Sequence, residues 1–215
     1  MPEVDGATNF FLVLTIVADA VVAVAIVGAI AASVSSRARG SVVAWARAVA
    51  PQSVVFAWIV ATVTTLGSLY YSEHAGFVPC ELCWYQRIVM YPLVIVLGVA
   101  ALRRDRSIWM TALVFVVIGA PLSLYHWLVE RVPAFEQSSS CSATTPCSAP
   151  WFEKLGFVTL AWMAMSAFLL IGVLIVCTLL GSRDPVDETS SGTRDRVSVG
   201  GPGGPARSER QMEEA

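Results

Sequence analysis

Charged residues are scarce in this chain of 215 residues: Asp, Glu, Lys and Arg make up 14%, against a usual share of about 25%. Hydrophobic residues reach 56%, and the mean hydropathy is +0.67. A water-soluble enzyme of this size needs more charge to cover its surface, so that class is excluded. The net charge of −2 and the scattered basic residues also exclude the basic patch of a nucleic-acid-binding protein. The composition therefore predicts a polytopic membrane protein.

Apolar stretches that reach or approach the roughly 20 residues of a membrane-spanning helix recur five times. We expect spans at 10–34, 54–71, 88–102 with an extension to 82, 107–129 and 155–182. The first is interrupted only by Asp19, for which we expect a polar contact within the bundle. Pro92 and Pro121 are tolerated because neighbouring helices can satisfy the freed carbonyl groups. A cleaved signal peptide is the competing interpretation of the first stretch, but the acidic leader and long apolar core favour a retained helix.

Arginine side chains predict the orientation of these helices. Six of them follow the first and third stretches: Arg37, Arg39, Arg47, Arg103, Arg104 and Arg106. An excess of arginine marks the cytoplasmic side, and the opposite loops carry mainly glutamate. We therefore expect the N-terminus outside the cell, the C-terminus in the cytoplasm and a multi-pass protein of the cell membrane. The segment 182–215, rich in Gly, Ser, Pro and alternating charge, is predicted to be disordered.

Four of the five cysteines fall on the side predicted to be extracytoplasmic. Cys80 and Cys83 form Cys-Glu-Leu-Cys at the outer start of the third helix, and Cys141 and Cys147 lie in the loop before the fifth. An oxidising compartment allows thiol–disulfide chemistry to persist. Cys177 lies alone in the fifth stretch, where a free cysteine behaves as a small apolar residue.

The Cys-x-x-Cys motif by itself is a weak signal, because it serves metals as well as redox chemistry. Its redox role requires two close sulfurs with one reactive thiol, and the free N–H groups of a helix start favour a thiolate. Arg87, one turn after Cys83, adds positive charge at a depth where arginine is costly and usually functional. The alternative role for Arg87 is an anchor that reaches the membrane interface.

The loop pair Cys141 and Cys147 has two interpretations. It is either a static disulfide that pins the loop or a relay that exchanges with a soluble partner and then with the helix pair. Zinc is a third use for four thiolates, but the unequal spacing, the lack of an adjacent histidine and the oxidising compartment predict no metal. Haem attachment requires His after the second cysteine, where this chain has Trp84.

Residues 67–92, with Pro-Cys-Glu-Leu-Cys-Trp-Tyr-Gln-Arg at their centre, resemble the disulfide bond formation protein B (DsbB) family, and within it the forms called BdbC. Residues 123–127, Ser-Leu-Tyr-His-Trp, resemble that family's helix before the loop pair. The resemblance implies an all-α fold with a four-helix transmembrane domain at 49–181. An extra transmembrane helix and a cytoplasmic loop at 1–48 would precede that domain, and the tail at 182–215 would follow it.

The resemblance also implies an enzyme, a membrane thiol:quinone oxidoreductase that supports disulfide bond formation. Its partner would be an extracytoplasmic thioredoxin-fold thiol oxidase of the DsbA type. Cys141 would form the mixed disulfide with that partner, and Cys147 would pass the exchange to Cys80. Cys83 would then face a quinone, either menaquinone or ubiquinone, dissolved in the lipid bilayer.

The quinone site implied by the resemblance has Arg87 beside the thiolate and His126 near the quinone head. Trp84, Tyr85 and Tyr91 are candidates for a pocket around a flat ring, or else members of the aromatic belt at the membrane surface. The chain departs from the family pattern in its first helix, in the close spacing of the loop pair and in Gln86, where an acidic residue often precedes the arginine.

Two other functions compete with this interpretation. A vitamin K epoxide reductase-like enzyme also couples cysteine pairs to quinones, but there the loop pair precedes the membrane Cys-x-x-Cys motif, whereas here it follows. A non-catalytic membrane scaffold or chaperone with structural disulfides is the alternative from a different class. Quinone bound to the purified protein would favour an enzyme over a scaffold.

Overall fold

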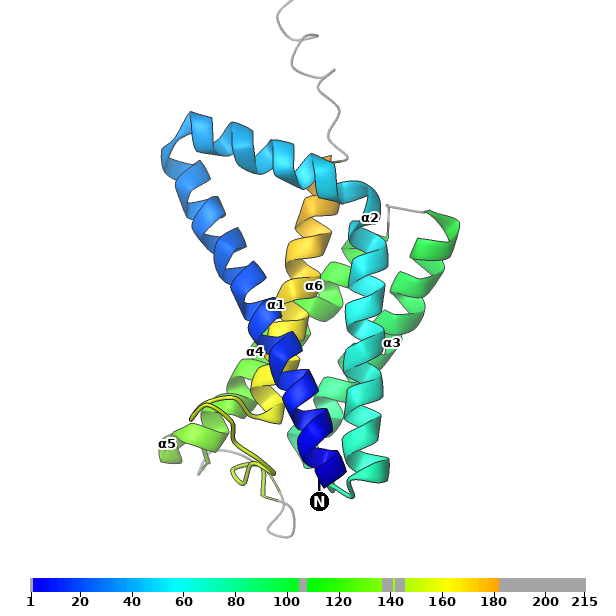
Figure 1. Ribbon diagram of the computed structural model, residues 1–215, viewed down its shortest axis with the longest axis vertical. Coiled ribbons are helices and arrows are strands. Elements are labelled where there is room, and N and C mark those ends of the chain that lie inside the picture. Colours follow the sequence, from blue (N-terminus) through cyan, green and yellow to red (C-terminus); the bar gives the residue numbers. More distant parts are fainter. Residues whose placement is uncertain (1, 105–107, 137–140, 142–145, 182–215) are drawn as a thin grey trace, which may run out of the picture. The chain divides into compact units, whose positions relative to one another are not determined.

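The structure is a computed structural model that describes residues 2–104, 108–136, 141 and 146–181. The predicted disordered tail at 182–215 lies outside these residues. Among the described residues, five helices are long and apolar enough to cross a membrane (Figure 1). They are α1 (Pro2–Val34), α2 (Ser36–Leu69), α3 (Glu81–Arg103), α4 (Trp109–Arg131) and α6 (Leu160–Gly181).

Two short elements complete the set of helices in the described residues. The π-helix η1 (Tyr70–His74) extends α2, and the single turn α5 (Pro133–Glu136) follows α4. The only bridge of β type in the described residues is an isolated one between Lys154 and Val158. The prediction of an all-α polytopic membrane protein is confirmed.

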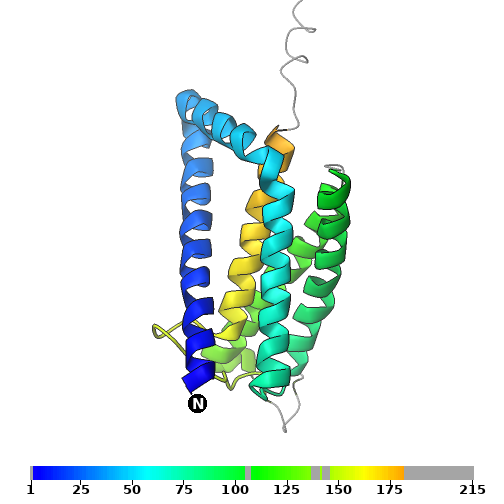
Figure 2. The same ribbon diagram turned by 45° about the vertical axis from the view of Figure 1, so that its right-hand side comes forward.

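The largest departure from the predicted spans is at the start of the second helix. It was expected at residue 54, but α2 begins at Ser36, so most of the loop expected between the first two helices is helical. Ser35 alone separates α1 from α2, and its side chain caps α2 by accepting from the Ala38 N–H. The prediction was wrong here because it relied on apolar runs, and the arginine-rich start of α2 is helical without being apolar. Pro51 lies within α2, which changes direction along its length in Figures 1 and 2.

The core lies between α2, α3, α4 and α6. Leu93 and Leu97 of α3 and Phe168 and Ile171 of α6 are buried there. A side chain at Gly119 of α4 would overlap the ring of Phe168, so the glycine permits the close approach of α4 and α6. α1 packs against α2 and α6, outside this four-helix core (Figure 2).

Elements that carry the cysteine motifs gather at one end of the bundle. Figure 1 shows the start of α1, η1, the start of α3 and the chain between α5 and α6 at this end. The α1–α2 junction and the ends of α3 and α6 lie at the other end, together with the arginines of those segments. The fold therefore separates the cysteine pairs from the arginine-rich segments by the length of the membrane-spanning helices.

Candidate redox site

The helix pair is built into the start of α3. Cys80 is the N-cap residue, in an extended conformation with φ −71° and ψ 173°, and its sulfur accepts a hydrogen bond from the Cys83 backbone N–H at 3.4 Å. The two sulfur atoms lie 3.0 Å apart, and both cysteines are free. Because the first N–H groups of a helix have no partners within it, this position stabilises negative charge on sulfur.

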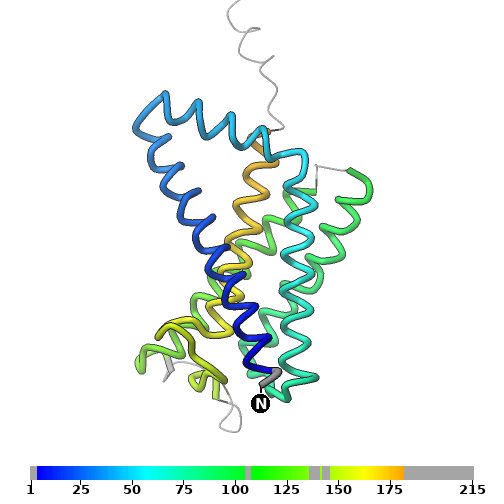
Figure 3. The backbone as a smooth tube through the Cα atoms, viewed as in Figure 1, coloured from blue at the N-terminus to red at the C-terminus, as the bar shows by residue number. Residues whose placement is uncertain are grey.

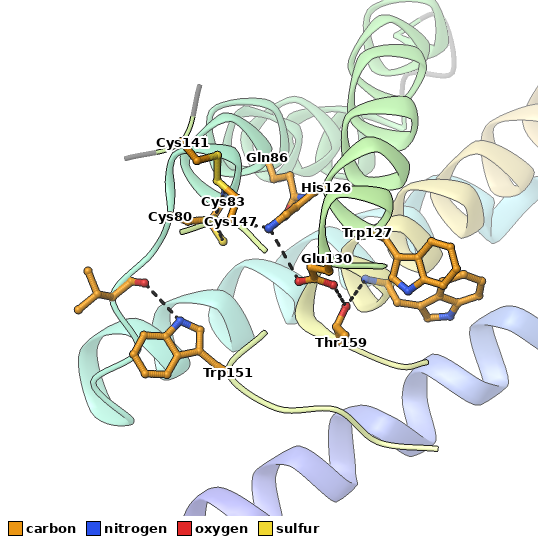
Figure 4. A network of polar contacts seen from close by, with 12 residues as sticks. Cys80, Cys83, Gln86, His126, Trp127, Glu130, Cys141, Cys147, Trp151 and Thr159 are labelled. Atoms are coloured by element: carbon orange, nitrogen blue, oxygen red, sulfur yellow. Dashed lines mark hydrogen bonds and ion pairs between the residues drawn. A yellow bond between two sulfur atoms is a disulfide. The ribbon is translucent and has the colours of Figure 1, made fainter. Parts of the chain in front are cut away.

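A chain of polar side chains leads away from Cys80. Its sulfur lies 3.5 Å from Nε2 of His126, a buried residue of α4. The Nδ1 atom of the same ring lies 3.1 Å from Nε2 of Gln86. Glu130, one turn after His126, lies 3.9 Å from the ring and accepts a hydrogen bond from Thr159 at 2.6 Å (Figure 4). The same ring nitrogen of His126 therefore faces the Cys80 sulfur and, at longer range, the Glu130 carboxyl group.

These contacts change the acidity of Cys80. The hydrogen bond with the Cys83 side chain is the main cause that lowers the pKa of Cys80 from 9.0 to about 4. Burial acts in the opposite direction, and the hydrogen bond and positive field of His126 lower the pKa further. A thiol with a lowered pKa is a thiolate at neutral pH, which is the form that attacks and leaves disulfides.

The loop pair packs directly against the helix pair. Cys141 and Cys147 are joined by a disulfide, and Cys147 is buried in one cluster with Cys80 and Val129 (Figure 4). Cys141 is more exposed and packs against the edge of that cluster. Both cysteine pairs thus meet at one place, with the more exposed sulfur on the loop. The disulfide occupies two of the four sulfurs that a four-thiolate zinc site would need.

Three side-chain atoms at the helix pair lie close enough together to hold a metal ion. The Cys80 and Cys83 sulfurs and a ring nitrogen of His126 all lie within 4.8 Å of one another. A metal held by both thiolates would prevent them from forming a disulfide. The prediction of no metal therefore remains a consequence of the redox interpretation.

The described part of the loop is attached to α4 and to the segment just before α3. Arg131 donates hydrogen bonds to Glu153 at 3.3 Å and to the carbonyl of Gly156 at 2.9 Å. The Trp127 indole donates to the carbonyl of Phe157 at 3.0 Å, and the Trp151 indole donates to the carbonyl of Val78 at 3.3 Å. These contacts hold the chain that follows Cys147 over the end of the bundle.

A cavity of about 310 Å³ lies beside the helix pair, between α1, α2, α3 and α6. Cys83, Arg87 and Tyr91 line it from α3, whereas Cys80 is not part of its lining. Ser68 of α2 holds the guanidinium, since Arg87 donates to its hydroxyl at 3.0 Å and to its carbonyl at 3.1 Å. The Tyr91 hydroxyl is buried and has no hydrogen-bond partner among the described residues.

The rest of the lining is mainly apolar and comes largely from α1, α2 and α6. Hydrogen-bond donors on one wall of an apolar cavity suit a ligand with acceptor oxygens on an apolar body. Such a ligand would lie against the sulfur of Cys83. Cys83 therefore has the cavity on one side and the cluster of Cys80 and Cys147 on the other.

The predicted cofactor residues divide into two groups. Arg87 and Tyr91 line the cavity, whereas Trp84 and His126 do not belong to its lining. Trp84 is 53% exposed, and the Cζ atom of Arg87 lies 5.3 Å from the centre of its ring. His126 faces Cys80 instead. Cys177 is buried in α6, and it too lies outside the cavity lining.

Sequence reasoning missed the partners of His126. Glu130 follows the span expected at 107–129, but it lies in α4 four residues after His126. The signal was available, because two titratable residues at this spacing share one face of an apolar helix. Gln86 was noted only as a departure from the family pattern, and its contact with His126 came from the structure.

Comparison with known proteins identifies the family. The model of the family "Disulfide bond formation protein DsbB" matches residues 51–181. The chain belongs to the DsbB family. The resemblance seen in the sequence is thereby confirmed, and the chain is a multi-pass membrane oxidoreductase of disulfide bond formation.

Curated relatives carry names of the same kind. Disulfide bond formation protein C of Bacillus subtilis (strain 168) is 44% identical over 126 residues, which cover 59% of this chain and 91% of the relative. A probable disulfide formation protein of Oceanobacillus iheyensis is 46% identical over 118 residues, covering 54% of this chain and 81% of the relative. A probable disulfide formation protein of Coxiella burnetii (strain CbuK_Q154) is 42% identical over 125 residues, covering 58% and 85%. No solved structure matches the chain.

Proposed function

We propose that this chain is a thiol:quinone oxidoreductase that takes electrons from an extracytoplasmic thioredoxin-fold oxidase of the DsbA type. One observation carries the proposal: Cys83 and Arg87 line an apolar cavity, while Cys80 packs against the disulfide of the loop. The helix pair therefore lies between an apolar binding site, which Cys83 lines, and the loop disulfide, whose Cys147 shares a buried cluster with Cys80. A scaffold with structural disulfides has no need of either contact.

The thiol exchange follows from the exposure of the sulfurs. A thiolate of the partner attacks Cys141, the more exposed loop sulfur, and releases Cys147 as a thiolate. Cys147 attacks Cys80 of an oxidised helix pair and releases Cys83. The second partner thiol then displaces Cys141, which attacks Cys147 and frees Cys80. The partner ends as a disulfide, the loop pair is restored, and the helix pair has gained two electrons and two protons.

The cavity fits a quinone. The Tyr91 hydroxyl is a buried donor without a partner among the described residues, and a quinone oxygen is an acceptor. Arg87 is held in place by Ser68, and the remaining walls suit an isoprenoid tail. A bound quinone, whether menaquinone or ubiquinone, supplies an acceptor for two electrons and two protons. In this arrangement Arg87 stabilises negative charge on Cys83, which lies one helical turn away.

His126 stabilises the thiolate of Cys80, the other member of the pair. Its ring lies 3.5 Å from the Cys80 sulfur and 3.9 Å from a Glu130 oxygen. Because the Gln86 amide nitrogen donates to Nδ1, Nε2 carries a hydrogen that it donates to the Cys80 thiolate. Glu130, which Thr159 holds by a hydrogen bond, lies near the same nitrogen. His126 is thus assigned to Cys80 rather than to the quinone head.

We also propose that the cysteine-bearing end faces out of the cell, because the arginine-rich segments lie at the opposite end. The test is an impermeant thiol label on full-length chains whose native cysteines are replaced. Asp5→Cys is the suitable probe near the N-terminus, because the Asp5 side chain is exposed. Thr8, also near the N-terminus, is unsuitable because it is buried and hydrogen-bonded to Tyr71. We expect labelling of Asp5→Cys in intact cells and of a Ser36→Cys control only after lysis. The reverse pattern would contradict the orientation.

The function itself is tested with the purified full-length protein. We expect quinone in its organic extract, and we expect quinone absorbance to fall when a reduced thioredoxin-fold oxidase is added. Cys177→Ala serves as the control, because its sulfur lies outside both the cavity and the cysteine cluster. A protein that neither retains nor reduces quinone would exclude the proposal and favour the scaffold.

A further inference from the structure

Helix α1 is the membrane-spanning helix that lies wholly outside the match to the family. The family match begins at residue 51, and α1 ends at Val34. A helix added to a complete bundle can be a simple membrane anchor, with no role in the site. Its contacts argue otherwise.

Specific contacts fasten α1 to the bundle near both the outer end and the middle. Near the outer end, the Tyr71 hydroxyl donates to Thr8 at 3.2 Å, and Phe11 lies so close to Gly67 that a Cβ atom there would come within 2.8 Å of its ring. In the middle, Asp19 accepts two hydrogen bonds from α6. The Trp162 indole donates at 2.9 Å and the Ser166 hydroxyl donates at 2.5 Å.

The Asp19 contact confirms the polar role expected for this residue, and it fixes α1 where it crosses α6 (Figure 3). An aspartate in an apolar helix is costly unless its oxygens are bonded. Ser166, one of its two partners, also lines the cavity. The anchor of α1 therefore lies at the edge of the candidate quinone site.

One face of α1 forms a wall of that site. The α1 residues in the cavity lining are Phe11, Leu14, Thr15, Val17, Ala18 and Val21. They recur at helical spacing over nearly three turns. α3 supplies Cys83, Arg87 and Tyr91 to the same cavity. The side of α1 away from the bundle is apolar and exposed, as at Val13 and Val24, and suits contact with lipid.

We propose that α1 is the lipid-side wall of the quinone site, and that it holds the quinone by contact with its isoprenoid tail. The inference rests on the function proposed above. The polar groups of α3 fit the ring, and the face of α1 offers mainly apolar side chains to the tail. With α1 between the cavity and the lipid, the bound quinone exchanges with the membrane more slowly than it would from an open groove. Residues of α1 thereby determine which tail is retained.

The first experiment compares two neighbouring residues of α1 in the full-length protein. Leu14→Trp places bulk into the cavity, whereas Val13→Trp, on a residue that is 58% exposed and outside the lining, places it toward lipid. The probe is a photoreactive azido-ubiquinone, with labelled peptides mapped by mass spectrometry. We expect labelling within residues 11–21 of the wild type. Leu14→Trp should weaken retention of the probe by about tenfold, and Val13→Trp should match the wild type.

The kinetic form of the same comparison uses a ubiquinone analogue that keeps a short isoprenoid tail. Leu14→Trp should raise its KM while kcat and mixed-disulfide formation at Cys141 stay near the wild-type values. If label is absent from α1 and both tryptophan variants retain the probe equally, the inference is wrong. In that event, quinone reduction that still depends on Cys83 would leave the proposed function standing. A wild-type protein that neither binds nor reduces quinone would overturn both.

Asp19 provides an independent variant in case Leu14→Trp does not fold. Asp19→Ala removes both acceptors that fasten α1 to α6, while Asp19→Asn keeps one. We expect retained quinone to fall in the order wild type, Asp19→Asn, Asp19→Ala. Mixed-disulfide formation at Cys141 should remain unchanged, because the described loop pair packs in the cluster of Cys80 and Val129, to which none of Asp19, Trp162 and Ser166 belongs. Equal quinone content in all three proteins would contradict the inference.

Discussion

Cys80 and Cys83 belong to one short motif but lie in different surroundings. Cys80, just before the helix, meets His126 and packs with the buried loop sulfur of Cys147. Cys83, in the first turn, lines the apolar cavity together with Arg87. A spacing of three residues at a helix start keeps the sulfurs 3.0 Å apart while their other neighbours differ. This arrangement supports the proposal that one dithiol serves both a polar exchange site and an apolar acceptor site.

The two surroundings handle charge differently. On the Cys80 side, hydrogen bonds from Cys83 and His126 stabilise a thiolate, and Glu130 lies 3.9 Å from the same ring nitrogen. On the Cys83 side the walls are mainly apolar, so the charge of Arg87 is the main compensation for a charge that develops there. Substitutions on each side should consequently affect different steps.

The largest effect is expected from removing either sulfur. Cys80→Ser and Cys83→Ser should each abolish quinone reduction by a reduced thioredoxin-fold partner, because each leaves half of the dithiol that joins the two sites. Stopped-flow absorbance of the quinone measures this. Cys177→Ala should keep wild-type turnover. Substantial turnover in either serine variant would contradict the assigned site.

Removing the charge on the cavity side should have the next largest effect. Arg87→Gln is expected to slow quinone reduction by roughly 10²-fold, the usual loss for one preorganised charged or donor group. Arg87→Lys should lie between, because an ammonium cannot reproduce the planar contacts with Ser68. Mixed-disulfide formation at Cys141 should be unaffected in both. An unchanged quinone rate in Arg87→Gln would show that the arginine is only an interface anchor.

On the other side, the lowered pKa of Cys80 can be tested directly. Because the folded value is about 4, the thiolate should persist above this pH and disappear as the pH falls through it. His126→Phe should move the titration midpoint to higher pH, and Cys83→Ala should move it further, since the Cys83 hydrogen bond is the larger cause. Ultraviolet absorbance of the thiolate reports the midpoint in chains that lack Cys141, Cys147 and Cys177. A midpoint near 9 in the protein that retains both His126 and Cys83 would refute a lowered pKa for Cys80.

The smallest effect is expected at Trp84, which lies outside both surroundings. Trp84→Leu removes a cation–π contact with Arg87 that is worth about 0.5–1 kcal/mol at an exposed site. Quinone reduction should therefore fall by less than about fivefold, because Ser68 still holds the guanidinium. The assay is the same quinone absorbance. A loss as large as that of Arg87→Gln would mean that Trp84 takes part in the site.

Much of the site could be predicted from the sequence. The Cys-x-x-Cys motif at a helix start, Arg87 one turn later and a second cysteine pair in a loop are local patterns, and each carries its own chemistry. The helices were also predictable, because long apolar runs in a chain with little charge have few alternatives. The start of α2 was not, since its helix is arginine-rich rather than apolar.

The sequence by itself determined that the protein is an all-α membrane protein with two cysteine pairs and an arginine beside one of them. Only the tertiary structure showed that His126 contacts Cys80, from 46 residues away, and that Asp19 fastens α1 to a tryptophan 143 residues away. The physical reason is the range of each interaction. Helix formation and the spacing within a motif depend on near neighbours, whereas the face that each helix turns toward the cavity depends on how all five pack together.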